Sequence, residues 1–168
     1  YLCNLIIEKL PNNSALKAQV IGEAYFWRAW ANFNLVRMWG TPPLVDHVLA
    51  PNELTPPNGE AAALWSYVET SLDKAIQMLP EKAGLGQQSA IGGRVTKHSA
   101  YALLGKAQVM QGHYTDALTA LEKVINSGKY SLLANFRDLY HVAGDYSDEY
   151  MWEWNMADAD QANFAEEG

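Results

Sequence analysis

The sequence predicts an all-α protein built from antiparallel helix pairs, and three observations lead to this prediction. Apolar side chains recur every three or four residues over most of residues 2–128, which is the period of a helix with a buried face. Proline or glycine follows most of these segments, where either residue ends a helix. The 168 residues, 49% of them apolar, suffice for one core and are too few for two. We therefore expect a helical scaffold over residues 1–128 and an irregular segment over residues 129–168.

The first two helices are expected at residues 2–10 and at about residues 14–39. Pro11 ends the first helix, and the hydroxyl of Ser14 is a suitable cap for the start of the second. The second helix carries apolar residues on two faces, so we expect it to be packed on two sides. Gly40 ends it, and the prolines that recur up to residue 59 predict a long inserted loop.

Three more helices follow this loop, at about residues 60–79, 96–111 and 114–127. The first stops at Pro80, a glycine-rich polar loop comes next, and the last two helices are joined by a tight turn at Gly112 and His113. After Gly128 the helical pattern ends. Residues 150–155 alternate polar and apolar side chains, as a strand does.

The last helix pair has the spacing of a tetratricopeptide repeat. Small residues at Gly105 and Ala117 allow two helix backbones to approach closely, and larger side chains such as Leu121 fill the space around this contact. The same order occurs earlier in the chain, with Ala31 as the small residue and with Val68, Leu72 and Ala75 on the partner helix. The prediction is a tetratricopeptide-like superhelix in which Ala31 and Gly105 are points of close contact.

Composition excludes several classes of function. A net charge of −7 argues against a nucleic-acid partner. The single cysteine, Cys3, excludes an intrachain disulfide framework, and the four histidines have no metal-site spacing, so we expect neither a metal nor another cofactor. Glu149 and Glu153 would lie about 13 Å apart on a strand, too far for a glycosidase pair, and are expected to be solvated. We therefore expect no enzyme activity.

Three segments, in order along the chain, carry a family resemblance. Residues 22–45 (GEAYFWRAWANFNLVRMWGTPPLV), residues 93–107 (GRVTKHSAYALLGKA) and residues 112–132, which include GHYTDA and VINSGKYSL, resemble the SusD/RagB family. The resemblance covers about residues 4–155. It implies an outer-membrane, cell-surface binding protein that captures polysaccharide or oligosaccharide, with peptide as the rarer ligand, and passes it to a SusC-like TonB-dependent transporter.

The resemblance also implies how the protein is attached to the membrane. It implies that a lipid anchor holds the protein on the cell surface and that this anchor lies outside the sequence given. No segment is apolar over the roughly 20 residues that a membrane span needs. The chain begins at Tyr1 without an initiator methionine or a signal segment, so we expect an internal fragment that lacks most of the ligand site.

The candidate carbohydrate-binding residues are Trp152, Trp154 and Asn155. On a strand, the two tryptophans would lie on one face about 7 Å apart, where they could stack on successive sugar rings while Asn155 binds hydroxyls. Packing in a core is the alternative for both. The helical tryptophans, Trp27, Trp30, Trp39 and Trp65, are expected to pack.

Two further expectations concern Arg28 and the class of function. Arg28 lies in a helix and is expected to pair with a buried carboxylate or to cap a carbonyl rather than to bind ligand. The alternative function is a tetratricopeptide adaptor that binds a protein or peptide segment in its groove. The interrupted first repeat favours glycan capture, because an adaptor would show more units.

Overall fold

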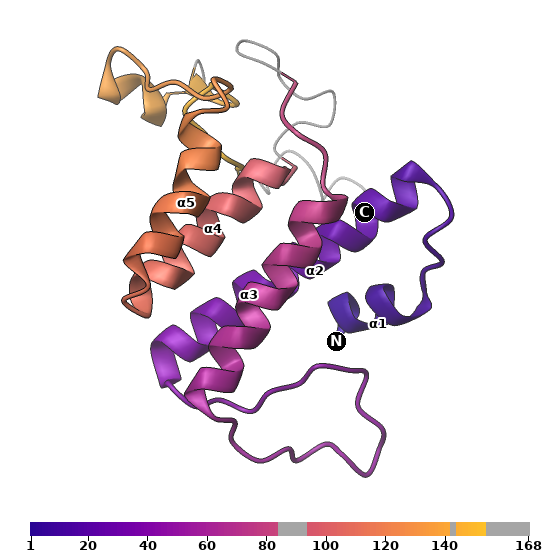
Figure 1. The fold of residues 1–168 in the computed structure, drawn as a ribbon. Coiled ribbons are helices and arrows are strands. Elements are labelled where there is room, and N and C mark those ends of the chain that lie inside the picture. Colours follow the sequence, from indigo (N-terminus) through magenta and orange to yellow (C-terminus); the bar gives the residue numbers. More distant parts are fainter. Residues whose placement is uncertain (84–93, 142–143, 154–168) are drawn as a thin grey trace, which may run out of the picture.

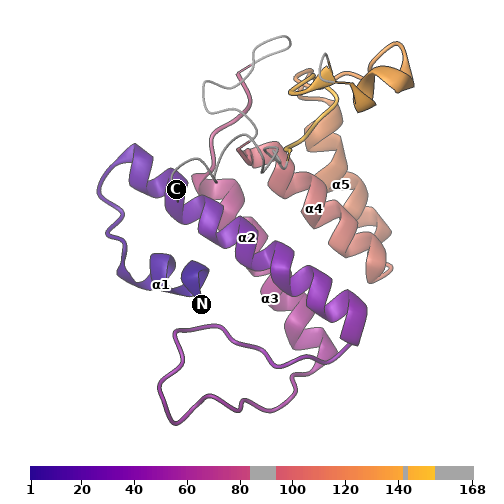
Figure 2. The same ribbon diagram turned by 180° about the vertical axis from the view of Figure 1, so that it is seen from behind.

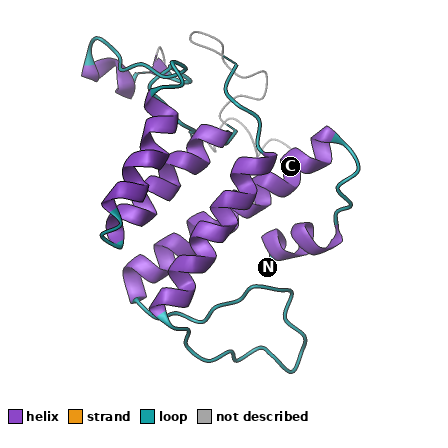
Figure 3. Cartoon of the chain, in the orientation of Figure 1, coloured by secondary structure: helices purple, strands orange, loops and turns teal. Residues whose placement is uncertain are grey.

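The computed structural model describes residues 1–83, 94–141 and 144–153 of the chain, and over these ranges it is all-helical (Figure 3). The α-helices are α1 (Leu2–Lys9), α2 (Ala15–Trp39), α3 (Ala61–Met78), α4 (Lys97–Met110) and α5 (Tyr114–Ile125), followed by a 3-10 helix, η1 (Phe136–Tyr140). The β-structure in the described ranges is a single antiparallel bridge between Pro43 and Asn58. This confirms the predicted all-α, tetratricopeptide-like fold class.

The helix ends lie within one or two residues of the predicted ones, because local side chains determine them. The Ser14 hydroxyl accepts a hydrogen bond from the Lys17 amide (3.3 Å) at the start of α2. Gly40 ends α2 with φ of +75°, a left-handed conformation that glycine adopts without a steric penalty. Thr96 and Ser99 form a reciprocal capping box at the start of α4.

The α-helices after α1 form two hairpins that pack against each other. α2 and α3 lie side by side along most of their length, α4 packs on α3, and α5 packs on α4 (Figures 1 and 2). The core between them consists of residues that are completely buried: Phe26, Ala29, Val68, Leu72, Ala75, Ala100 and Ala107. In the described ranges, no helix combines the length and the apolar character that crossing a membrane requires.

Gly105 is a point of close helix contact, as predicted. A Cβ atom at this position would lie 2.6 Å from Leu121 Cγ and 3.2 Å from the Ala117 carbonyl oxygen. Gly22 plays a similar part in the first hairpin, since a Cβ there would lie 2.9 Å from Met78 Cβ. The absence of a side chain therefore sets the spacing of both hairpins.

The prediction for Ala31 is wrong, because Ala31 is exposed to solvent. The alanine that packs in the core is Ala29, two residues earlier, with an exposed fraction of 0%. The repeat spacing that points to Ala31 does not tell which face of α2 meets α3. α2 is covered on more than one side, and Trp27 and Trp30 contact Trp152.

Arg28 joins α2 to α1 and α3. Its guanidinium donates hydrogen bonds to Asn4 Oδ1 (3.2 Å) and Ser71 Oγ (3.1 Å), and it lies over the rings of Tyr25 and Tyr67. Of the two predicted partners, a buried carboxylate is not found for Arg28 among the described residues; its acceptors there are the carbonyl oxygen of the Asn4 amide and a hydroxyl. These side chains can accept the guanidinium without a second buried charge.

Arg94, at the start of the segment before α4, forms an ion pair with the carboxylate of Glu23 on α2. The inserted loop is held by α1. Asn4 donates to the carbonyl oxygens of Val45 (3.2 Å) and His47 (3.0 Å), so the same buried amide serves both the loop and Arg28. The first helix is thus attached through polar contacts and not only through its apolar face.

The contact at Gly105 gives a prediction for stability. Gly105→Ala should lower the free energy of unfolding by about 1–3 kcal/mol, because the new methyl group overlaps Leu121 and α5 must move away from α4. Urea unfolding monitored by circular dichroism measures this change.

The matched control is the Leu121→Ala background, in which the space for the methyl group is open. There Gly105→Ala should be neutral or stabilising, since alanine favours a helix over glycine by roughly 1 kcal/mol. If Gly105→Ala stabilised the unaltered chain, the close contact would not exist.

Candidate functional site

Residues 129–141 and 144–153 follow α5, and contacts with the start of α4 and with the segment after α3 hold them in place. The Ser99 hydroxyl donates to the carbonyl oxygen of Met151 (2.9 Å), and the hydroxyls of Tyr130 and Thr96 lie 3.1 Å apart. Lys82 forms an ion pair with Asp148, and both side chains are largely buried. These contacts place the segment beside the aromatic residues of α2.

Trp152, one of the three predicted ligand residues, lies in an aromatic cluster. Its ring meets those of Phe26, Trp27 and Trp30 edge to face, with centroid distances of 6.3, 5.3 and 6.4 Å. Trp152 is half-buried, and the predicted strand is not found over residues 150–153. Trp154 and Asn155 lie outside the described residues.

The carboxylates of Glu149 and Glu153 hold the backbone of this segment. Glu149 Oε2 accepts from the Leu133 amide (2.7 Å), and Glu153 Oε2 accepts from the Tyr146 amide (2.8 Å). The expectation that both are merely solvated is therefore wrong. Irregular backbone leaves amide donors that neither a helix nor a sheet satisfies, and these two side chains accept from them.

The other tryptophans differ in burial. Trp27, Trp30 and Trp65 are half-buried and pack against the core, as predicted. The prediction that Trp39 packs is wrong, since 66% of its surface is exposed. It stands at the last residue of α2, where the chain turns away at Gly40.

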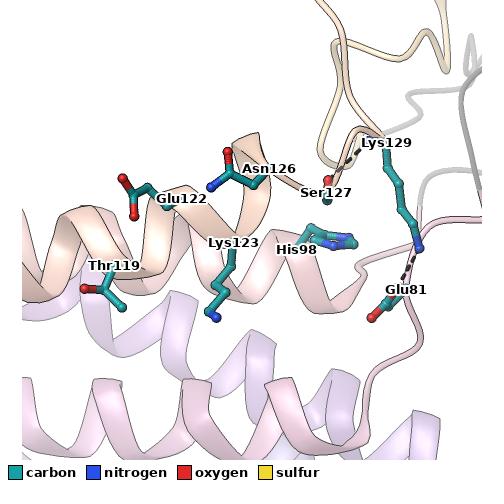
Figure 4. Close-up of a pocket in the computed structure, with 8 residues that line it drawn as sticks. All are labelled: Glu81, His98, Thr119, Glu122, Lys123, Asn126, Ser127 and Lys129. Carbon is teal, nitrogen blue, oxygen red and sulfur yellow. Dashed lines mark hydrogen bonds and ion pairs between the residues drawn. The ribbon is translucent and has the colours of Figure 1, made fainter.

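A polar cavity of about 370 Å³ lies where α4 and α5 meet the segment after α3 (Figure 4). Side chains from three parts of the chain line it, among them Glu81, His98, Lys123, Asn126 and Lys129. Lys129 Nζ lies 2.6 Å from one Glu81 carboxylate oxygen, and Lys97 Nζ lies 3.8 Å from the other.

His98 is the buried titratable group of this cavity. It is 5% exposed, and its ring meets that of Tyr130 edge to face. Nδ1 is buried and has no hydrogen-bond partner among the residues that the structure describes. Burial lowers the pKa of His98, and the nearby Glu81 carboxylate partly opposes this shift. The imidazole is therefore neutral at pH 7.

No sequence pattern singles out His98, since it has no metal-site or catalytic spacing. The one sequence feature that could have indicated its burial is its position in the first turn of α4, two residues after the capping residue Thr96. Within the described ranges, no three side chains of the His, Cys, Asp or Glu type gather as ligands for a metal ion.

A wider depression of about 700 Å³ lies between α3 and the turn that joins α4 to α5. Trp65 lines it together with Glu69, Asp73, Gln111 and His113. Gln111 Nε2 donates to Glu69 Oε1, and burial followed by the charge of Glu69 raises the pKa of Asp73. An indole beside carboxylate and amide groups can bind a polar, hydroxylated ligand.

Comparison with known proteins identifies the family. A family model for SusD-like proteins, described as starch-binding and associating with the outer membrane, matches residues 1–109. A SusD-like protein of Formosa agariphila is 30% identical over 147 residues, and a second one from the same organism is 21% identical over 175 residues. The chain therefore has a SusD-type helical scaffold. It belongs to the SusD-like family.

Solved structures show the same fold. A SusD-like protein from Bacteroides fragilis is 25% identical with a TM-score of 0.81, and the match covers 94% of this chain and 31% of that one. A laminarin-binding SusD-like protein is 28% identical with a TM-score of 0.81, covering 89% of this chain and 34% of that one. The two Formosa matches cover 99% and 83% of this chain but 32% and 27% of the relatives. The chain thus spans about a third of the length of the relatives it matches.

The unpaired imidazole gives a prediction for pH dependence. The pKa of His98 is lower in the folded state than the ordinary value, so the unfolded state binds a proton more readily. This contribution lowers stability as the pH falls through about 6.5. His98→Phe keeps a ring in place and should reduce the loss of unfolding free energy between about pH 7.5 and pH 5.5.

Urea unfolding at the two pH values measures this effect. His47→Gln is the control with the opposite sign, because hydrogen bonds to Asp46 and then Glu53 raise the pKa of His47. The His47 contribution is present at low pH and lost as the pH rises. An unchanged pH dependence in His98→Phe would contradict the neutral, buried state of His98.

Proposed function

We propose that the intact protein captures oligosaccharide at the cell surface and does not hydrolyse it. The observation that carries the proposal is membership of the SusD-like family, supported by the likeness to a laminarin-binding SusD-like protein. A SusD-like protein from Bacteroides fragilis is likewise described as carbohydrate-binding. The helical hairpins serve as the scaffold, and residues 129–168 belong to the ligand side.

We also propose where the protein is located and which partner receives its ligand. The protein is held at the outer membrane by a lipid anchor and passes its ligand to a SusC-like TonB-dependent transporter. The family description, which refers to association with the outer membrane, supports the location. The resemblance of the sequence to the SusD/RagB family supports the transporter as the partner.

The absence of catalysis is also part of the proposal. Glycoside hydrolysis needs two carboxyl groups about 5 to 9.5 Å apart on either side of the bond that is cleaved. Glu149 and Glu153 are the carboxylates considered above as a glycosidase pair. Each accepts a hydrogen bond from a backbone amide, that of Leu133 or of Tyr146. Their role in holding the segment accounts for both residues without catalysis.

For the ligand site, we keep Trp152, Trp154 and Asn155 as the proposed residues and assign them different parts. The three ring contacts of Trp152 favour a role in fixing the segment against α2. Trp154 and Asn155 then supply the sugar contacts, one through stacking and the other through hydroxyl groups. The adaptor alternative has no comparable support, because the relatives named by their ligand bind glycans.

A glycan array with the intact protein, followed by calorimetry and an assay for new reducing ends, tests this proposal. We expect binding of at least one oligosaccharide and no release of reducing sugar. Trp154→Ala should weaken that binding roughly tenfold or more while leaving the thermal midpoint unchanged.

Trp152→Ala is the matched variant. It should lower the free energy of unfolding by roughly 2 kcal/mol or more, because it removes the partner of three aromatic rings. Product formation would contradict the binding role. Equal affinity of Trp154→Ala and the unaltered protein would contradict the assigned site.

A further inference from the structure

α5 carries apolar side chains on a face that none of the described helices covers. Tyr114, Leu118 and Ile125 are 70%, 58% and 73% exposed, and together with the half-buried Leu121 they follow the spacing i, i+4, i+7 and i+11. Residues at this spacing form one stripe along a helix, as they do where two helices pack. We refer to these four residues as the outer stripe of α5.

α5 is the last helix of the stack in the described part of the chain. Among the described helices it packs on α4 alone, and Figures 1 and 2 show α4 lying between α5 and α3. The polar residues of α5, such as Thr115, Thr119 and Lys123, lie on a different side of the helix from the outer stripe. α5 is therefore apolar toward α4 and also apolar on a neighbouring face that meets solvent.

The internal repeat assigns each position of α5 an equivalent on α3. Its spacing aligns Val68 of α3 with Ala117 of α5, and the same alignment pairs Ser71 with Ala120. All four residues are buried. The two helices thus turn equivalent faces toward the core, so the remaining faces of α3 and α5 can also be compared.

On α3, the residues equivalent to Tyr114, Leu118 and Ile125 are covered. They are Trp65, Glu69 and Ile76. Trp65 and Ile76 are half-buried and pack against a core that includes residues of α4. The Glu69 carboxylate accepts a hydrogen bond from the side chain of the residue that ends α4. The side of α3 that α4 covers therefore corresponds to the side of α5 that is exposed.

A further helix of the same protein is the occupant that fits this face. Units of a helical repeat bury their outer apolar side chains against the next unit, and contiguous exposed apolar residues mark a contact surface. Leu118 stands where α3 has Glu69, so the exposed face of α5 is more apolar than the face that α4 covers. The stretches matched in the two Formosa relatives are 32% and 27% of their length, so proteins of this family have more chain that can supply such a helix.

We propose that the outer stripe of α5 is the docking face for a further amphipathic helix of the intact protein, which packs on α5 as α4 packs on α3. The docked helix presents an apolar stripe of its own to the four residues and removes them from solvent. The inference concerns the helical scaffold and does not rest on the proposed capture of oligosaccharide, so either can fail without the other.

Thiol labelling of the intact protein tests whether the outer stripe is covered. Cys3 is first replaced by serine, and Leu118→Cys is then compared with Thr119→Cys, the next residue, which is exposed on the polar side of the same helix. A maleimide should react at least about tenfold more slowly with Leu118→Cys, because the docked helix must open first. Equal rates would overturn the proposal. If Leu118→Cys does not fold, Ile125→Cys and Lys123→Cys give the same comparison.

Photo-cross-linking identifies what covers the outer stripe. Tyr114→p-benzoylphenylalanine keeps an aromatic ring at one end of the stripe and should give a cross-linked product with the mass of a single chain. Mass spectrometry should place the second attachment point on a helix other than α1 to α5. A product with the mass of two chains, or protection of Leu118→Cys that rises with protein concentration, would show that a second copy covers the stripe and would overturn the assignment.

Discussion

The structure depends on two places where helix backbones approach closely because a side chain is absent. At Gly105 the leucine of the facing helix occupies the position that a methyl group would need, and at Gly22 the end of α3 does so. Packed interiors leave no room for an added carbon without movement of the backbone. Each glycine sets the spacing of one hairpin. The second hairpin thereby positions the start of α4, which contacts Tyr130 and Met151 of the segments after α5.

Polar contacts then attach the irregular parts to this helical scaffold. Asn4 and Arg28 connect the first helix, the inserted loop and α3, and Lys82 and Asp148 connect the segment after α3 to residues near the end of the described chain. Loops carry backbone groups that need partners, and buried amides, hydroxyls and carboxylates supply them here. The proposed ligand side is thus held by specific hydrogen bonds and by the aromatic cluster around Trp152.

The sequence predicted the helices well because their ends are local. Ser14, Gly40, Thr96 and Pro80 each act on the chain within one turn, so no knowledge of the fold was needed. The errors concern tertiary contacts. Two faces of α2 are covered, so the sequence pattern does not distinguish Ala31 from Ala29, which is the alanine buried in the core. Glu149 is predicted to be solvated, but its carboxylate accepts a hydrogen bond from the amide of Leu133, 16 residues away in the chain. The unpartnered nitrogen of His98 has no counterpart in the sequence pattern.

We propose that the helical scaffold supports a separate ligand side after residue 128. Hydrogen exchange of the intact protein, with and without an oligosaccharide that it binds, tests this most directly. We expect the ligand to slow exchange in residues 129–168 and to leave exchange in α2, α3 and α4 unchanged. Slower exchange confined to α2 and α3, with none after residue 128, would contradict it.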